Sequence, residues 1–95
     1  MGLYEGLFII QPDLSQEEQK KVFTQIEEPI TKGGGTIETA QEWGRRPLAY
    51  FIRRKKEGLY YLVRFQLEPK SVPALRKDYS LNEAILNSLI TRLKT

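Results

Sequence analysis

The stretch from Trp43 to Lys56, WGRRPLAYFIRRKK, holds the residues best suited to bind or react with another molecule. Guanidinium groups form paired hydrogen bonds with phosphate oxygens, and nearby aromatic rings stack on unpaired bases. The pattern therefore predicts a surface that binds a polyanion, with RNA as the leading class. The alternative is an edge hairpin whose charges only keep it soluble and unpaired. The stretch has no acid and six cations, namely Arg45, Arg46, Arg53, Arg54, Lys55 and Lys56.

The positive charge of the chain is local. Residues 1–42 carry eight acids against three lysines, a net charge of −5, whereas residues 43–64 carry seven cations against one acid, a net charge of +6. Residues 65–95 carry five bases and three acids, which brings the whole chain to +3. This asymmetry favours one surface that faces a polyanion over a generally basic protein.

The composition argues against catalysis. Without cysteine or histidine the chain lacks thiolate nucleophiles, zinc-thiolate sites and the commonest general base. The glutamate pairs at 17–18 and 27–28 have no partner for acid–base or metal chemistry, and the glycines at 33–35 follow a helix instead of opening one. We therefore predict no enzyme activity, no metal, no cofactor and no small-molecule substrate.

The chain is also expected to stay out of membranes. It has no apolar run of about 18 residues, and its acidic, polar start lacks the basic-then-apolar order of a secretory signal. We expect residues 1–95 to form a single soluble, intracellular domain.

The aromatic residues near the basic stretch have several possible roles, as core, as stacking surfaces or as contacts with a partner. Tyr61 shares the apolar phase of its strand and is expected in the core. Tyr60 is the neighbouring residue and therefore lies on the opposite face of the sheet. There it is equally expected to bind a partner or only to cover the sheet. The residues predicted to contact a protein partner are Trp43, Tyr50 and Tyr60.

The first half of the chain predicts a strand followed by a helix. Leu3 to Ile10 is apolar and ends at a proline, as in a central strand buried on both faces. Ser15 and Glu18 have the spacing of a capping box, and Pro29 is expected to kink or tighten the helix near Glu28 before the glycines end it. The helix residues predicted to face the core are Val22, Phe23, Ile26 and Ile30.

The basic stretch itself predicts strands. Residues 36–43 alternate as in a half-exposed strand, Gly44 allows a bulge, and Pro47 indicates an edge. The strand then continues to Ile52, and Glu57-Gly58 has the composition of a hairpin tip. Residues 59–67 alternate again and are expected to pair antiparallel with the preceding strand.

The last third predicts a helix and a closing strand. Residues 69–79 form a short helix with Val72, Leu75 and Tyr79 inward. Residues 83–93 fit a helix or a strand with Ile85, Leu89 and Leu93 in phase, and a strand is favoured because it closes the sheet. The predicted fold is α+β, a ferredoxin-like β-α-β-β-α-β sandwich whose four-stranded antiparallel sheet has two helices on one face.

The motif Trp43-Gly44-Arg45-Arg46, then Leu48-Ala49-Tyr50 and Ile52, resembles the signature of the bacterial small-subunit ribosomal protein S6 family. Further matching positions follow in the family's order over essentially the whole chain: Tyr4-Glu5, Pro12, the glycines at 33–35, Gly58 with Tyr60, and Asn82-Glu83-Ala84.

The resemblance implies a ferredoxin-like fold, a final strand and a non-enzymatic role. It implies a cytoplasmic protein in the ribosome, with an organellar ribosome left open. Its implied partners are ribosomal protein S18 and the central domain of the small-subunit ribosomal RNA. Arg45 and Arg46 match the family's basic pair, whereas Arg53, Lys55 and Lys56 lie where basic residues are usual in the family and carry over more weakly. The predicted RNA contacts are Arg45, Arg46, Arg53, Arg54, Lys55, Lys56 and Arg92.

Several positions depart from the family pattern. Gly2 and Asn87 stand where cations are usual, so two phosphate contacts are expected to be missing. Pro47 and Phe51 are expected to alter the local strand geometry, and an acidic tail like that of some members is not expected.

Two other functions are compatible with the predicted fold, because one fold hosts many functions. The first is an acylphosphatase-like hydrolase or ligand-sensing domain with Arg45 or Arg46 as an anion clamp. The second is a protein-only module that adds a partner strand at the edge formed by residues 36–52.

Overall fold

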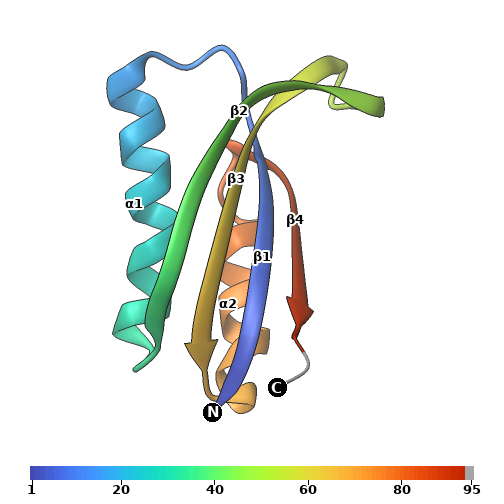
Figure 1. The fold of residues 1–95 in the computed structure, drawn as a ribbon. Coiled ribbons are helices and arrows are strands. Elements are labelled where there is room, and N and C mark those ends of the chain that lie inside the picture. Colours follow the sequence, from blue (N-terminus) through green and yellow to red (C-terminus); the bar gives the residue numbers. More distant parts are fainter. Residues whose placement is uncertain (94–95) are drawn as a thin grey trace.

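The computed structural model describes residues 1–93, apart from the side chains of Tyr50 and Phe51. The elements follow in the order β1 (Gly2–Ile10), α1 (Gln16–Lys32), β2 (Thr36–Ile52), β3 (Lys55–Leu67), a 3-10 turn (Pro69–Ser71), α2 (Val72–Ser80) and β4 (Ile85–Arg92). The four strands form one antiparallel sheet in the order β2-β3-β1-β4, and both helices lie on one face of it (Figure 1). The predicted ferredoxin-like fold is confirmed.

Strand β1 is central, as predicted, but only one of its faces is fully buried. Its side chains alternate between buried and half-buried along the whole strand. Phe8 and Ile10 point into the core under the helices, whereas Leu7 and Ile9 lie on the face that no helix covers. Phe8 meets Tyr79 of α2 edge to face at 4.8 Å, and the Tyr79 hydroxyl donates to the Ile26 carbonyl of α1 at 2.6 Å. The core therefore ties both helices to β1.

Helix α1 begins as its sequence predicts. Ser15 Oγ accepts from the backbone N–H of Glu18, and Glu18 accepts from the backbone N–H of Ser15. The four predicted inward residues are buried. The helix continues through Pro29 to Lys32, although Pro29 has no N–H to donate a hydrogen bond to the preceding turn. Gly34, at φ +86°, then turns the chain toward β2.

The long hairpin of β2 and β3 ends at a different place from the one predicted. Ile52 pairs with Lys55, so the tip is Arg53-Arg54, and both residues have positive φ, 50° and 65°. Glu57-Gly58 as the tip is wrong, because both residues lie inside β3. Gly58 is needed there for space, since a Cβ at this position would collide with the Ile9 side chain.

Strand β4 is confirmed, but its predicted phase is wrong. Ile85 pairs with Ile10 and Asn87 pairs with Ile9, so Leu86 is an extra residue at a bulge. After the bulge the alternation reverses, and Ile90 is buried instead of Leu89. Leu89 lies opposite Leu7 on the uncovered face and is 60% exposed.

The edge strand and the second helix follow the prediction. The register of β2 shifts between Glu42 and Gly44, where Gly44 has φ +82°, so the expected bulge is present. Strand β2 is an edge strand, as its proline indicated. In α2, the residues that face the core are Val72, Leu75 and Tyr79, as predicted.

We expect Gly58→Ala to lower the free energy of unfolding by about 1–3 kcal/mol, because the added methyl group overpacks the contact with Ile9. Urea denaturation measures this loss. Thr39→Ala, an exposed change on β2, is the control and should stay within about 0.5 kcal/mol of wild type. An equal stability of Gly58→Ala and wild type would contradict the close approach.

Candidate nucleic-acid interface

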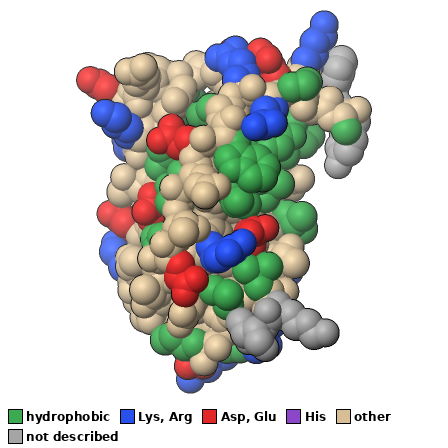
Figure 2. Space-filling model, in the orientation of Figure 1, with side chains coloured by type: hydrophobic (Ala, Val, Ile, Leu, Met, Phe, Trp, Pro, Cys, Tyr) green, Lys and Arg blue, Asp and Glu red, His purple; other side chains and the backbone are tan. Residues whose placement is uncertain are grey.

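The face of the sheet opposite the helices carries a strip of apolar side chains. Figure 2 shows these side chains gathered over β3, β1 and β4. Strand register places them on one face, with Leu7 opposite both Leu62 and Leu89, and Ile9 opposite Tyr60. We call this strip the apolar patch, and its members are Leu7, Ile9, Trp43, Leu48, Tyr60, Leu62 and Leu89.

Trp43 and Arg46 lie at the border of the apolar patch formed by the edge strand β2. The Trp43 ring is 43% exposed, and its indole N–H donates to the Gln41 side chain at 3.3 Å. The Arg46 guanidinium lies 5.4 Å from the centre of that ring, within range of a cation–π contact. Arg46 lies opposite Gly58 in the ladder, which places its charge beside the patch. This corner of the open face therefore combines a flat ring with a cation.

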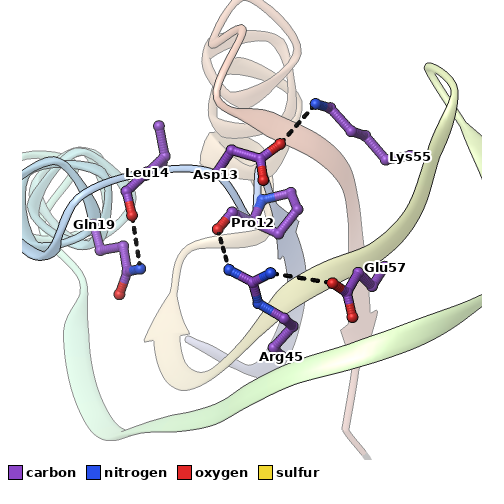
Figure 3. Close-up of polar contacts among 7 residues, drawn as sticks. All are labelled: Pro12, Asp13, Leu14, Gln19, Arg45, Lys55 and Glu57. Carbon is purple, nitrogen blue, oxygen red and sulfur yellow. Dashed lines mark hydrogen bonds and ion pairs between the residues drawn. The ribbon is translucent and has the colours of Figure 1, made fainter.

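Arg45 points the other way, because successive residues of a strand lie on opposite faces. Its guanidinium donates to the Pro12 carbonyl at 2.7 Å and forms an ion pair with Glu57 at 3.1 Å (Figure 3). The adjacent arginines predicted to act as one RNA clamp are therefore divided between two faces.

The cations of the hairpin tip are divided too. Lys55 forms an ion pair with Asp13 at 2.8 Å, and Arg53 donates to the Glu83 carbonyl at 3.0 Å. Arg54 and Lys56 are exposed, and within the described residues no carboxylate lies within 4.0 Å of either. Two cations of the tip therefore remain available to an outside anion.

Arg92 is far from this group. It pairs with Tyr4 at the end of the sheet opposite the hairpin, and its guanidinium lies 6.0 Å from the Tyr4 ring. The side chain of Tyr50, predicted to contact a partner, lies outside the described residues. The structure thus brings Trp43 and Tyr60 together with Arg46 but leaves Arg92 apart.

Sequence reasoning missed most of the apolar patch. The half-buried residues of β1 and β3 alternate with core residues, so their position on the open face was readable from strand periodicity. Leu89 could not be placed in this way, because the β4 bulge reverses its phase. Arg64 also lies on this face, where Glu5 pairs with it at 3.0 Å.

Two pKa shifts in the described residues come from an ion pair and from burial. The hydrogen bond and charge of Lys55 hold the pKa of Asp13 below its ordinary value. Burial, together with a 2.7 Å hydrogen bond to Glu27, raises the pKa of Tyr61, which is a core residue as predicted. Among residues 1–93, no three Asp, Glu, Cys or His side chains gather as metal ligands. None of the helices in this part of the chain has the length and apolar character to cross a membrane.

Comparison with known proteins identifies the family. The family model described as Ribosomal protein S6 matches residues 3–92. The chain belongs to the ribosomal protein S6 family. It is 39% identical to the small ribosomal subunit protein bS6 of Thermoanaerobacter pseudethanolicus, over 97% of each chain. It is 40% identical to bS6 of Pseudarthrobacter chlorophenolicus, over 97% of this chain and 91% of the relative.

Solved structures agree with the S6 assignment. The crystal structure of 30S ribosomal protein S6 from Thermotoga maritima aligns with a TM-score of 0.91 at 26% identity, over 97% of this chain and 87% of that one. The C-terminal domain of the MgtC protein from Mycobacterium tuberculosis aligns with a TM-score of 0.66 at 13% identity, so it shares the fold alone. As an S6 family member the chain is a structural protein of the small ribosomal subunit and not an enzyme, which removes the hydrolase alternative.

We expect the Asp13 carboxyl to titrate at a lower pH in wild type than in Lys55→Ala, because the ammonium stabilises the charged carboxylate. The pair is complete above the ordinary Asp pKa and is lost as the pH falls through the depressed pKa of the folded protein. NMR titration of the Asp13 side chain measures both midpoints. Identical midpoints would show that the ion pair is absent in solution.

Proposed function

We propose that this ribosomal protein binds the central domain of the small-subunit ribosomal RNA jointly with ribosomal protein S18. The observation that carries the proposal is the open sheet face, where a partly exposed apolar patch adjoins cations that no described acid neutralises. One surface thus provides neighbouring binding sites for a protein partner and for RNA. The names of both partners come from the family resemblance.

The RNA contact is assigned to the hairpin side of this face. Arg46, Arg54 and Lys56 have exposed charges that point into solvent from the β2–β3 hairpin. Phosphate groups bind such charges without the loss of an existing ion pair. Arg92, at the far end of the sheet, would reach a separate RNA segment.

The protein contact is assigned to the apolar patch. Interfaces between proteins have an apolar centre, enriched in aromatic residues, and a polar rim. Tyr60 and Leu62 are at the centre of the patch, and the rim contains Gln41 and the Glu5–Arg64 pair. The edge of β2 is less suited to adding a partner strand, because its register is interrupted by bulges.

We expect Arg46→Ala, Arg54→Ala and Lys56→Ala combined to weaken RNA binding and to flatten its salt dependence. Each lost phosphate contact lowers the slope of log affinity against log salt by about 0.7–0.9, so the slope should fall by about 2–3. Filter binding with S18 present, over a range of salt concentrations, measures it.

The matched control removes the same charge from the helical side, with Lys20, Lys21 and Lys77 changed to alanine. Its salt slope should remain close to that of wild type. Equal slopes for the hairpin variant and wild type would refute the assigned contacts.

We expect Leu62→Glu to weaken binding of S18 by about 10- to 100-fold, because the interface would bury an unpaired carboxylate. Isothermal titration calorimetry with purified S18 measures this. Leu81→Glu, on the helical side and 73% exposed in this protein, is the control and should bind like wild type. A loss of binding in Leu81→Glu alone would place the partner on the other face.

A further inference from the structure

We propose that Arg45, Lys55 and Arg53 are positioning residues that fasten the β2–β3 hairpin arm to two neighbouring loops, and thereby hold Arg46, Arg54 and Lys56 in place for phosphate. The hairpin arm is the part of the hairpin from Pro47 to Glu57. This inference rests on the proposed RNA binding and divides the basic stretch into two roles.

The strand ladder alone does not fix the direction of the arm. Pro47 pairs with Glu57 and Ile52 pairs with Lys55, so residues 48–51 of β2 face only Lys56 of β3. A ladder with so many extra residues on one strand is interrupted and bends. In Figure 1 the arm turns away from the line of the sheet at this point. Its direction must therefore be set by contacts outside the ladder.

Three contacts from the arm and its base reach two loops. Arg45 donates a hydrogen bond to the Pro12 carbonyl, and Lys55 donates one to the Asp13 carboxylate (Figure 3). Both acceptors lie in the loop between β1 and α1. Arg53 bonds to the Glu83 carbonyl in the loop between α2 and β4. The arm is thus held at both its base and its tip.

The two loops form one anchor. The backbone N–H of Gln11 donates to the Ala84 carbonyl at 2.9 Å, which joins the loops directly. The Gln19 side chain donates to the Leu14 carbonyl at 3.1 Å, which ties the first loop to α1. Two of the three contacts therefore end on backbone carbonyls of these joined loops, and the third ends on the side chain of Asp13 in the first loop.

The bonds of Arg45 make it a poor phosphate contact. Its guanidinium already donates hydrogen bonds to a backbone carbonyl and to Glu57. Turning toward an RNA phosphate would break both of these hydrogen bonds. If these hydrogen bonds stay in place, RNA binding loses no free energy by breaking them. An arm that is already fixed also loses less conformational entropy when RNA binds. Arg45 and Lys55 thus contribute through geometry, whereas Arg46 contributes through charge.

The test uses a change that adds positive charge. Asp13→Asn with Glu57→Gln, which we call the anchor variant, removes the two acids that pair with Lys55 and Arg45 and raises the net charge by two. If charge alone governs binding, the variant binds RNA more tightly than wild type. The positioning role predicts weaker binding, by about threefold to tenfold, as expected for two partly exposed ion pairs, with a salt slope no smaller than that of wild type.

The matched control removes two acids far from the arm, by Glu28→Gln with Glu68→Gln. It should bind the central-domain RNA, with S18 present, at least as tightly as wild type. If the anchor variant also binds as tightly as wild type or more tightly, the positioning role is overturned.

A charge exchange separates positioning from direct contact for Lys55. Asp13→Lys alone should weaken binding despite its added charge, and Asp13→Lys with Lys55→Asp should restore wild-type affinity, because the ion pair is rebuilt in reverse. If Lys55 contacts phosphate, the double variant stays weak and the proposal fails for this residue.

A readout without RNA distinguishes this inference from the proposed function. Amide ¹⁵N relaxation of the free protein should show faster motion of residues 48–57 in the anchor variant than in wild type. Unchanged relaxation would overturn the anchor even if RNA binding holds. If wild type fails to bind RNA but the arm of the anchor variant moves faster as expected, the proposed function is wrong and the anchoring of the arm is supported.

Discussion

The structure depends on one constraint, which is that both helices pack on the same face of a four-stranded sheet. Alternate side chains of β1 and β3 fill the space under the helices, where Phe8, Tyr79 and Ile26 join the layers. The other alternate side chains lie on the uncovered face, and those of Leu7, Ile9, Tyr60 and Leu62 are apolar and half-buried. An apolar surface that the protein's own helices do not cover favours burial against another molecule. The open face is therefore the side on which assembly is proposed.

The β2–β3 hairpin extends this face beyond the sheet. The cations of the hairpin fall into two groups, because alternate strand residues lie on opposite faces and because two loops lie next to some of these cations. Arg45 and Lys55 bond to the loop between β1 and α1, whereas Arg46 lies against Trp43 on the open face. A single basic stretch thus supplies both the support of the arm and the charge that the arm presents.

Much of this was predictable, and the exceptions have identifiable physical reasons. Helix α1 followed from its capping box and apolar spacing, because both act over a few residues. The hairpin tip was misplaced because Arg53-Arg54 has no glycine or asparagine to indicate positive φ, while Gly58 serves a close approach to Ile9. The phase of β4 depended on a bulge at Leu86 that only its partner strand reveals. The division of the basic stretch depended on which loops lie nearby, which is a tertiary property.

The most direct test of the account is side-chain accessibility before and after assembly. Hydroxyl-radical footprinting with mass spectrometry would compare the free protein with the protein in assembled small subunits. We expect strong protection of Tyr60, Leu62 and Leu89, because assembly is proposed to cover the open face, while Leu81 on the helical side keeps its reactivity. Protection of Leu81 with an unchanged open face would contradict it.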